Sequence, residues 1–260
     1  MLITLLKGYA YGINRSEDTK NKHMDIASSL AIVTLAALIH ASFQLSVSVL
    51  TLLSGHAIGA KKTQAKVIRL TFGFVSGVGV MTLLTLSFIS LIFLHLFGTE
   101  APQFVWAIAC GLLIGVGIAV WFFYYRPEAG TALWIPRGMA RHLSERSKAT
   151  NHSAEAFSLG LASVTSELLF IIAPMVISAL VLVQLPGVWQ LVGIAIYAII
   201  SLLTLVSVWI LISSGHRLSE IQKWREKNKR FLQFSAGSAL AILGFFVYVC
   251  KILTDVTGAA

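Results

Sequence analysis

One carboxylate lies in the middle of a long apolar segment of this 260-residue chain. Glu167 is the only one of the eleven acidic residues to fall inside such a segment, residues 156–183. A carboxylate at the centre of a bilayer costs roughly 2.5–3.5 kcal/mol to insert, so such residues are rare and by default mark a polar pathway, a proton or ion site, or an essential partner. We therefore expect Glu167 to belong to a functional site.

Polar side chains also gather in an earlier apolar segment, residues 27–54. His40, Gln44 and Ser48 recur there every four residues, which places them on one face of a continuous helix. His40 would act as a proton partner or ligand, and Gln44 would replace water around a solute. The opposing hypothesis is that these groups only form interhelical hydrogen bonds in a packed bundle, at about 0.6 kcal/mol each.

Serines supply the rest of the predicted substrate or ion site. Ser163 precedes Glu167 by one helical turn, and Ser46 lies near the centre of the first apolar segment. Their hydroxyls would bind the solute together with Gln44, while Glu167 would supply the charge or accept a proton. Small hydroxyl residues also let helices pack closely, which is the structural alternative for both serines.

Composition indicates an integral membrane protein. The chain is 57% hydrophobic and 12% charged, whereas soluble domains carry about 25% charged residues. The net charge of +9 is confined to loops and tails, which favours contact with anionic lipid over nucleic-acid binding. Cys110 and Cys250 lack a C-x-x-C spacing, so neither a disulfide framework nor a zinc site is expected. No cofactor motif is found, and none is expected.

Six segments are long and apolar enough to cross a bilayer as helices, which need about 20 residues. The predicted fold class is therefore an all-α polytopic membrane protein. Pro174 predicts a kink in the fourth segment because it removes one backbone hydrogen bond. Two small-residue patterns, Gly73-x-x-x-Gly77 and Gly111-x-x-x-Gly115, predict close helix packing. The six segments are residues 27–54, 70–96, 103–125, 156–183, 188–213 and 231–253.

The distribution of Lys and Arg predicts the orientation. The loops after the first, third and fifth segments carry four, five and six basic residues, and the two short turns between the other segments carry none. Basic loops remain in the cytoplasm. Both termini are therefore expected on the outer side of a cell membrane, which is either an inner or a plasma membrane. Residues 137–148 and 216–230 could form short amphipathic helices at the cytoplasmic side. The basic run within 216–230 is expected to face solvent or lipid headgroups.

An offset near 120 residues relates the two halves of the chain. Leu83-Leu84-Thr85-Leu86 recurs as Leu202-Leu203-Thr204-Leu205 at an offset of 119, and Ala41-Ser42 recurs as Ala162-Ser163 at 121. Repeats of three segments must be inserted upside down relative to each other, an architecture that places transporter sites at the midplane. The offset of 121 pairs Glu167 with Ser46.

The repeat defines the expected domain boundaries. Residues 1–26 form a tail with an N-terminal interfacial helix as one option, and residues 27–126 form the first three-helix repeat. Residues 127–153 form a cytoplasmic linker, 154–253 the second repeat, and 254–260 a C-terminal tail.

Six segments in two inverted triplets, with polar residues on the first and fourth, resemble the superfamily of LysE-type amino-acid exporters. That superfamily includes the CcdA/DsbD thiol-electron carriers and the NicO-type nickel and cobalt exporters. The thiol carriers keep a cysteine on the first and fourth helices, whereas Cys110 and Cys250 lie on the third and sixth. The resemblance covers residues 27–253 in architecture and implies a six-helix transporter without assigning a branch.

The sequence therefore predicts a transporter, in the direction of export, that moves a small polar solute or a cation by alternating access, with proton coupling through Glu167. Its partners would be the lipid bilayer and the solute, with a homo-oligomer or another membrane protein as a further option. The alternative is a non-transporting membrane subunit or assembly factor that docks a partner through its basic loops and Glu167. The chain lacks H-E-x-x-H and G-x-S-x-G motifs, so an enzyme is not expected.

Overall fold

The computed structural model describes residues 26–43, 45–59, 62–124, 137–215 and 218–253, and every regular element among them is a helix. Because a helix satisfies its own backbone hydrogen bonds, it is the form expected of long apolar segments in lipid. In chain order the elements are the helix Ile26–Ser42, α2 (Leu45–Gly59), α3 (Gln64–Phe97), α4 (Gln103–Phe123), α5 (Arg137–Ala149), α6 (Ser153–Val183), α7 (Gly187–Ser201), α8 (Leu203–Ser213), α9 (Leu218–Tyr248) and the π-helical turn η1 (Val249–Leu253).

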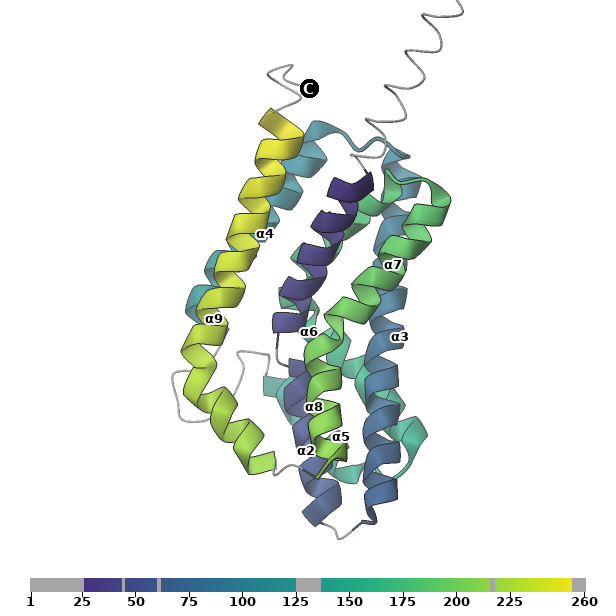
Figure 1. Ribbon diagram of the computed structural model, residues 1–260, viewed down its shortest axis with the longest axis vertical. Coiled ribbons are helices and arrows are strands. Elements are labelled where there is room, and N and C mark those ends of the chain that lie inside the picture. The colour runs from purple at the N-terminus through teal and green to yellow at the C-terminus, as the bar shows by residue number, and fades with distance from the viewer. Residues whose placement is uncertain (1–25, 44, 60–61, 125–136, 216–217, 254–260) are drawn as a thin grey trace, which may run out of the picture.

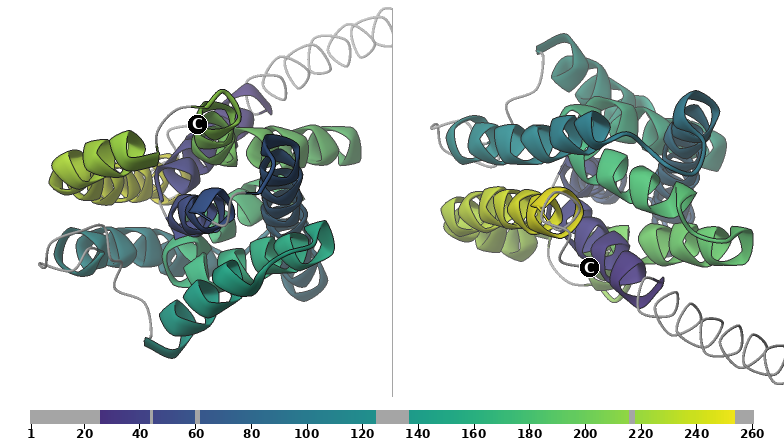
Figure 2. Two further views of the ribbon diagram at one scale, coloured as in Figure 1. Left: turned by 90° about the horizontal axis from the view of Figure 1, so that it is seen from below. Right: turned by 90° about the horizontal axis from the view of Figure 1, so that it is seen from above.

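Four of these helices are individually long and apolar enough to cross a membrane, and two bent pairs raise the number to as many as six. Figure 1 shows the long helices running along a common direction, and the end-on views of Figure 2 show them side by side in a bundle. The all-helical fold class is confirmed, and the lengths of the helices are compatible with a multi-pass membrane protein. Each of the six predicted segments coincides with one long helix or with one bent pair.

Two of the predicted segments are not continuous helices. The first divides into Ile26–Ser42 and α2, whose axes are bent by 43° relative to each other, and the fifth divides into α7 and α8, which are bent by 46° at Leu202. For His40 and Ser48, the expectation that they share one face of an unbroken helix is therefore wrong. His40 belongs to the first half of the broken segment, and Ser48 belongs to α2.

The most extensive helix contacts join α3 to α6 and α4 to α9. Glycines allow the approach: a Cβ on Gly77 or Gly160 would collide with the backbone of the facing helix, and a Cβ on Gly117 would lie 2.8 Å from the carbonyl oxygen of Gly237. The prediction of close packing holds at Gly77. It is wrong for Gly111-x-x-x-Gly115, because nothing lies within 4 Å of a Cβ at either glycine.

The basic segments lie together at one end of the bundle, which we call the basic end. Figure 1 places α5, the end of α2 and the start of α9 there, and the two short turns at residues 98–102 and 184–186 at the opposite end. The predicted helix 137–148 is confirmed as α5. The predicted short helix 216–230 is the first part of α9, which continues without interruption into the last apolar segment.

Candidate functional site

The carboxylate of Glu167 lies inside the bundle at the break in the first apolar segment. Only 3% of the residue is exposed. The backbone N–H of Leu45, the first residue of α2, donates to Oε1 at 3.0 Å, and the Ser46 hydroxyl donates to Oε2 at 2.9 Å. The sequence prediction that Glu167 and Ser46 meet across the two halves is therefore matched by a direct hydrogen bond.

This arrangement explains why α2 can begin in the interior of the bundle. The first four N–H groups of a helix have no partner within it, and the start of a helix carries a partial positive charge. A carboxylate from α6 satisfies one of these donors and complements that charge. Ser163, one turn before Glu167 on α6, places its hydroxyl 3.3 Å from the Ser46 hydroxyl and donates to the Gly160 carbonyl.

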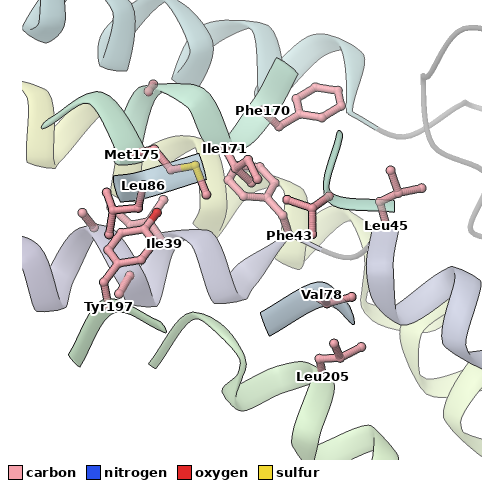
Figure 3. Packing of buried hydrophobic residues seen from close by; sticks show 14 of the residues in the cluster. Ile39, Phe43, Leu45, Val78, Leu86, Phe170, Ile171, Met175, Tyr197 and Leu205 are labelled. Carbon is pink, nitrogen blue, oxygen red and sulfur yellow. The ribbon is translucent and has the colours of Figure 1, made fainter. Parts of the chain in front are cut away.

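Aromatic packing holds Phe43, the residue that directly follows the helix Ile26–Ser42. The Phe43 side chain is buried, and its ring centroid lies 5.4 Å from that of Tyr124 and 6.0 Å from that of Phe170. Figure 3 shows Phe43 beside Ile171 on α6, within the apolar cluster that surrounds the break. Offset and edge-to-face ring pairs contribute about 0.5–1.5 kcal/mol beyond their buried area, so Phe43 fixes the position from which α2 starts.

His40 has a different partner from the one predicted. Its Nδ1 lies 3.1 Å from the hydroxyl of Tyr197 on α7, and both side chains are buried. Within the described part of the chain, no hydrogen bond joins His40 to Glu167. The pair His40–Tyr197 connects the first half of the broken first segment to α7. A role for His40 at the solute stays a prediction.

Gln44, the fifth predicted site residue, lies outside the described residues. Pro174, the predicted kink, is buried within α6, which continues as one helix from Ser153 to Val183. A bend at Pro174 stays a prediction.

Arg225 is the site residue that the sequence reasoning missed. It belongs to the basic run of α9, which was expected to face solvent or headgroups, yet it is 2% exposed and is the largest fully buried side chain among the described residues. Its Nη2 donates to the Ser48 hydroxyl at 2.8 Å. For Arg225 the expectation of a solvated face is wrong.

Three helices therefore meet at the first turn of α2. Glu167 from α6 binds Leu45 and Ser46, and Arg225 from α9 binds Ser48. The cluster holds a carboxyl group, a guanidinium and hydroxyls in the interior of the bundle, a set of groups that suits a proton at the carboxyl or a small polar solute. No group of three His, Cys, Asp or Glu side chains suited to a metal ion is found in the part of the chain that the structure describes.

Comparisons of the chain with models of known families, with curated proteins and with solved structures find no match. The class that the fold defines is a helical chain with up to six candidate membrane spans and a buried polar cluster at the break of the first.

Proposed function

We propose that this protein is a membrane transporter that exports a small polar solute by alternating access, with proton coupling through Glu167. The observation that carries the proposal is the buried carboxylate at the start of α2. Protonation of Glu167 would change the charge that faces the α2 N-terminus and would weaken the hydrogen bonds to Leu45 and Ser46. A proton can thus change the contact between α6 and the broken segment, which is what a coupled transporter requires.

The proposal includes an architecture of six spans in two inverted repeats. Figure 1 supports it, because the first and fourth spans run in opposite directions along the bundle, as inverted copies must. Repeated halves of this kind place their site where discontinuous helices meet near the bilayer midplane. The break between Ile26–Ser42 and α2 is such a discontinuity.

Contacts between residues about 120 positions apart give independent support. Ser46 binds Glu167 at an offset of 121, and Gly117 packs on Gly237 at an offset of 120. A pseudo-twofold axis would bring such equivalent residues together.

A second pair of contacts follows the same offset. Adding 120 to His40 gives Gly160, and adding 120 to Gly77 gives Tyr197. His40 meets Tyr197, and Gly77 packs on Gly160. These two contacts are therefore equivalent under the proposed repeat, although one is polar and the other is a close backbone approach.

The arrangement favours a polar solute over a cation as the cargo. The buried Arg225 already supplies a positive charge to this cluster through its bond to Ser48, and a second cation beside it would be repelled. The resemblance to LysE-type exporters agrees with a small polar solute and with the direction of export. The alternative role, a non-transporting subunit, requires that Glu167 pair with a helix of a partner protein. Glu167 is instead buried within this chain, which gives that role no support.

Flux in proteoliposomes tests the proposal. A panel of small polar metabolites is screened for proton-driven uptake with the full chain, and the variant Glu167→Gln is compared at the same protein density. We expect the pH-driven flux of the variant to be at least tenfold lower than that of the unchanged chain, because a carboxamide cannot exchange a proton. Glu155→Gln is the matched control, since Glu155 lies at the exposed start of the same helix. Unchanged flux in Glu167→Gln would remove proton coupling through this residue.

A further inference from the structure

α4 and α9 form an antiparallel pair that extends from the first to the last turn of α4. In the last turn, the Trp121 indole donates to the Phe234 carbonyl at 3.1 Å, and the two rings stack with centroids 6.1 Å apart. In the first turn, the ammonium of Lys251 lies 5.7 Å from the centre of the Trp106 ring. The close glycine contact described above lies between these two points. Figures 1 and 2 show the two helices side by side over this distance, so the pair is one packed unit, which we call the arm.

The arm is joined to the rest of the bundle through α4. α4 packs on α6, whereas α9, among the labelled elements of the described chain, packs extensively on α4 and on its own continuation η1 alone. The other long helices, which we call the core helices, are Ile26–Ser42, α2, α3, α6, α7 and α8. Because α4 supplies the contact with the core helices, α9 is the edge of the arm that has freedom to move.

A groove lies between α9 on one side and the helix Ile26–Ser42 and α8 on the other. It consists of two hollows of about 730 Å³ and 490 Å³, which share Leu38 and Ser42. Residues of α9 from Glu220 to Phe246 line it, so the groove follows nearly the whole helix. Small residues let helices approach closely, and both walls carry them: Ala41, Ser42, Ser235, Ala236 and Ala239.

Glycines connect the arm to the core helices at both ends of the bundle. Gly98 lies between α3 and α4 with a φ of 68°, and Gly215 lies between α8 and α9 with a φ of 85°. These two are the positive-φ glycines of the described residues, and nothing lies within 4 Å of a Cβ at either. Residues that absorb the backbone rotation of a hinge lie in such element-terminal positions, and glycine has the widest range of φ.

Two polar contacts tie α9 and its continuation to the core helices. Nη2 of Arg225 donates to the Ser48 hydroxyl at 2.8 Å, and Nζ of Lys251 donates to Oε1 of Gln184 at 3.3 Å. Arg and Lys carry long flexible stems, so these contacts limit the separation of the arm from the core helices but permit a closer approach. Closure of the groove is therefore the direction of motion that the contacts allow.

We propose that the arm is a moving unit, which swings on Gly98 and Gly215 and closes the groove by bringing α9 onto the helix Ile26–Ser42 and α8. The structure shows the open arrangement. Arg225 lines the first hollow and binds Ser48, so closure covers the groove wall next to the Glu167 cluster. The motion does not depend on the transport proposal.

Double electron–electron resonance on the full chain in lipid nanodiscs tests the motion. Both native cysteines are replaced by Ser, and spin labels are attached to pairs of exposed positions on α3, α4, α8 and α9: Leu84, Ile108, Ile210 and Phe231. The pair Ile210–Phe231, between a core helix and the arm, should give two distances. The pair Ile108–Phe231 within the arm and the pair Leu84–Ile210 within the core helices should each give one.

A disulfide traps the closed arrangement. Two cysteines form a disulfide only when their Cα atoms are within about 7 Å, and Leu38→Cys with Ala239→Cys places them on opposite walls of the second hollow. Mild oxidation should form this bond, which peptide mass spectrometry detects. In the control, Leu38→Cys with Phe245→Cys should remain reduced, because Phe245 is exposed on α9 outside the hollow.

Glycine variants test the hinges. The double variant Gly98→Ala with Gly215→Ala should change the ratio of the two Ile210–Phe231 distances at least threefold, because alanine disfavours positive φ. Gly138→Ala is the control, since Gly138 lies in α5 and its Cβ also meets nothing within 4 Å.

Several outcomes would overturn the inference. A single Ile210–Phe231 distance together with no disulfide between Leu38→Cys and Ala239→Cys would show that the groove is permanently open and is filled by lipid or by another protein. Two distances for Ile108–Phe231 would show that α4 and α9 do not move as one unit. An unchanged ratio in the double glycine variant would remove the hinges from Gly98 and Gly215.

Discussion

Glu167 and Arg225 are two buried charges whose common contact is the first turn of α2. Neither residue would be stable alone in an apolar interior, because an uncompensated buried charge costs several kcal/mol. Each charge has a serine of α2 as a hydrogen-bond partner, at Ser46 and Ser48 respectively. The start of α2 is therefore a polar junction between α6 and α9.

Removal of Arg225 should destabilise the chain and should do so less when Glu167 is also neutral. Arg225→Met loses the bond to Ser48, and a hydrogen bond to a charged group contributes about 1.5–3 kcal/mol. We expect the double variant Arg225→Met with Glu167→Gln to be more stable than the sum of the two single variants predicts. Thermal unfolding in detergent measures all four proteins of this cycle.

Arg230→Met is the control for the loss of a basic residue, since Arg230 is exposed on the same helix. Strict additivity of the two single variants would show that the two charges do not interact in the folded state.

The sequence identified Glu167 and its partner Ser46 because the insertion cost and the repeat offset both pointed to them. Arg225 was missed because its neighbours are basic and the run was interpreted as one solvated face. One signal was present: Ile221, Arg225 and Leu232 follow a helical spacing of four and seven residues, which places the arginine on the apolar stripe of α9. The partner Ser48 could not be inferred, since the two residues are 177 positions apart and only the fold brings the Arg225 side chain to Ser48.

Helix boundaries were predicted well at the level of the element, and helix breaks were not. Long apolar segments determine where helices lie, but residues 43–44 contain neither proline nor glycine. The break there is compensated by Glu167, a residue more than 120 positions away, and a local pattern carries no information about such a partner. Likewise, Gly111 and Gly115 have the spacing of a packing pattern, yet the close approach on α4 occurs at Gly117.

Glycine substitutions test the packing of α3 on α6. Gly77→Ala and Gly160→Ala should each lower thermal stability, because the added Cβ meets backbone atoms of the opposite helix, which cannot move aside as a flexible side chain could. Overpacking of this kind typically costs about 1–3 kcal/mol.

Gly111→Ala and Gly115→Ala are matched controls on α4, where the Cβ enters open space. These controls should be neutral or slightly stabilising, since alanine favours a helix over glycine by about 1 kcal/mol. A loss of stability in the controls as large as in Gly77→Ala would contradict the assignment of the contact.

At the scale of the whole molecule, the basic end and the opposite end should lie on different sides of the membrane. Single cysteines are introduced into a background with Cys110 and Cys250 replaced by Ser, and intact cells are treated with a membrane-impermeant thiol reagent. Thr99→Cys and Val188→Cys, at the end with the short turns, should be labelled in intact cells. Arg146→Cys and Lys227→Cys should be labelled only after the membrane is permeabilised, because basic loops remain in the cytoplasm. The reverse pattern would invert the proposed orientation.

The close pairing of α3 with α6 and of α4 with α9 has a consequence for how the chain is made. α3 and α4 find their most extensive contacts on α6 and α9, which follow them in the sequence, so these contacts can form only after α6 and α9 have left the ribosome. Insertion and assembly are therefore separate events. We expect α3 and α4 to lack these contacts until residues 153–183 and 218–248 arrive to pair with them.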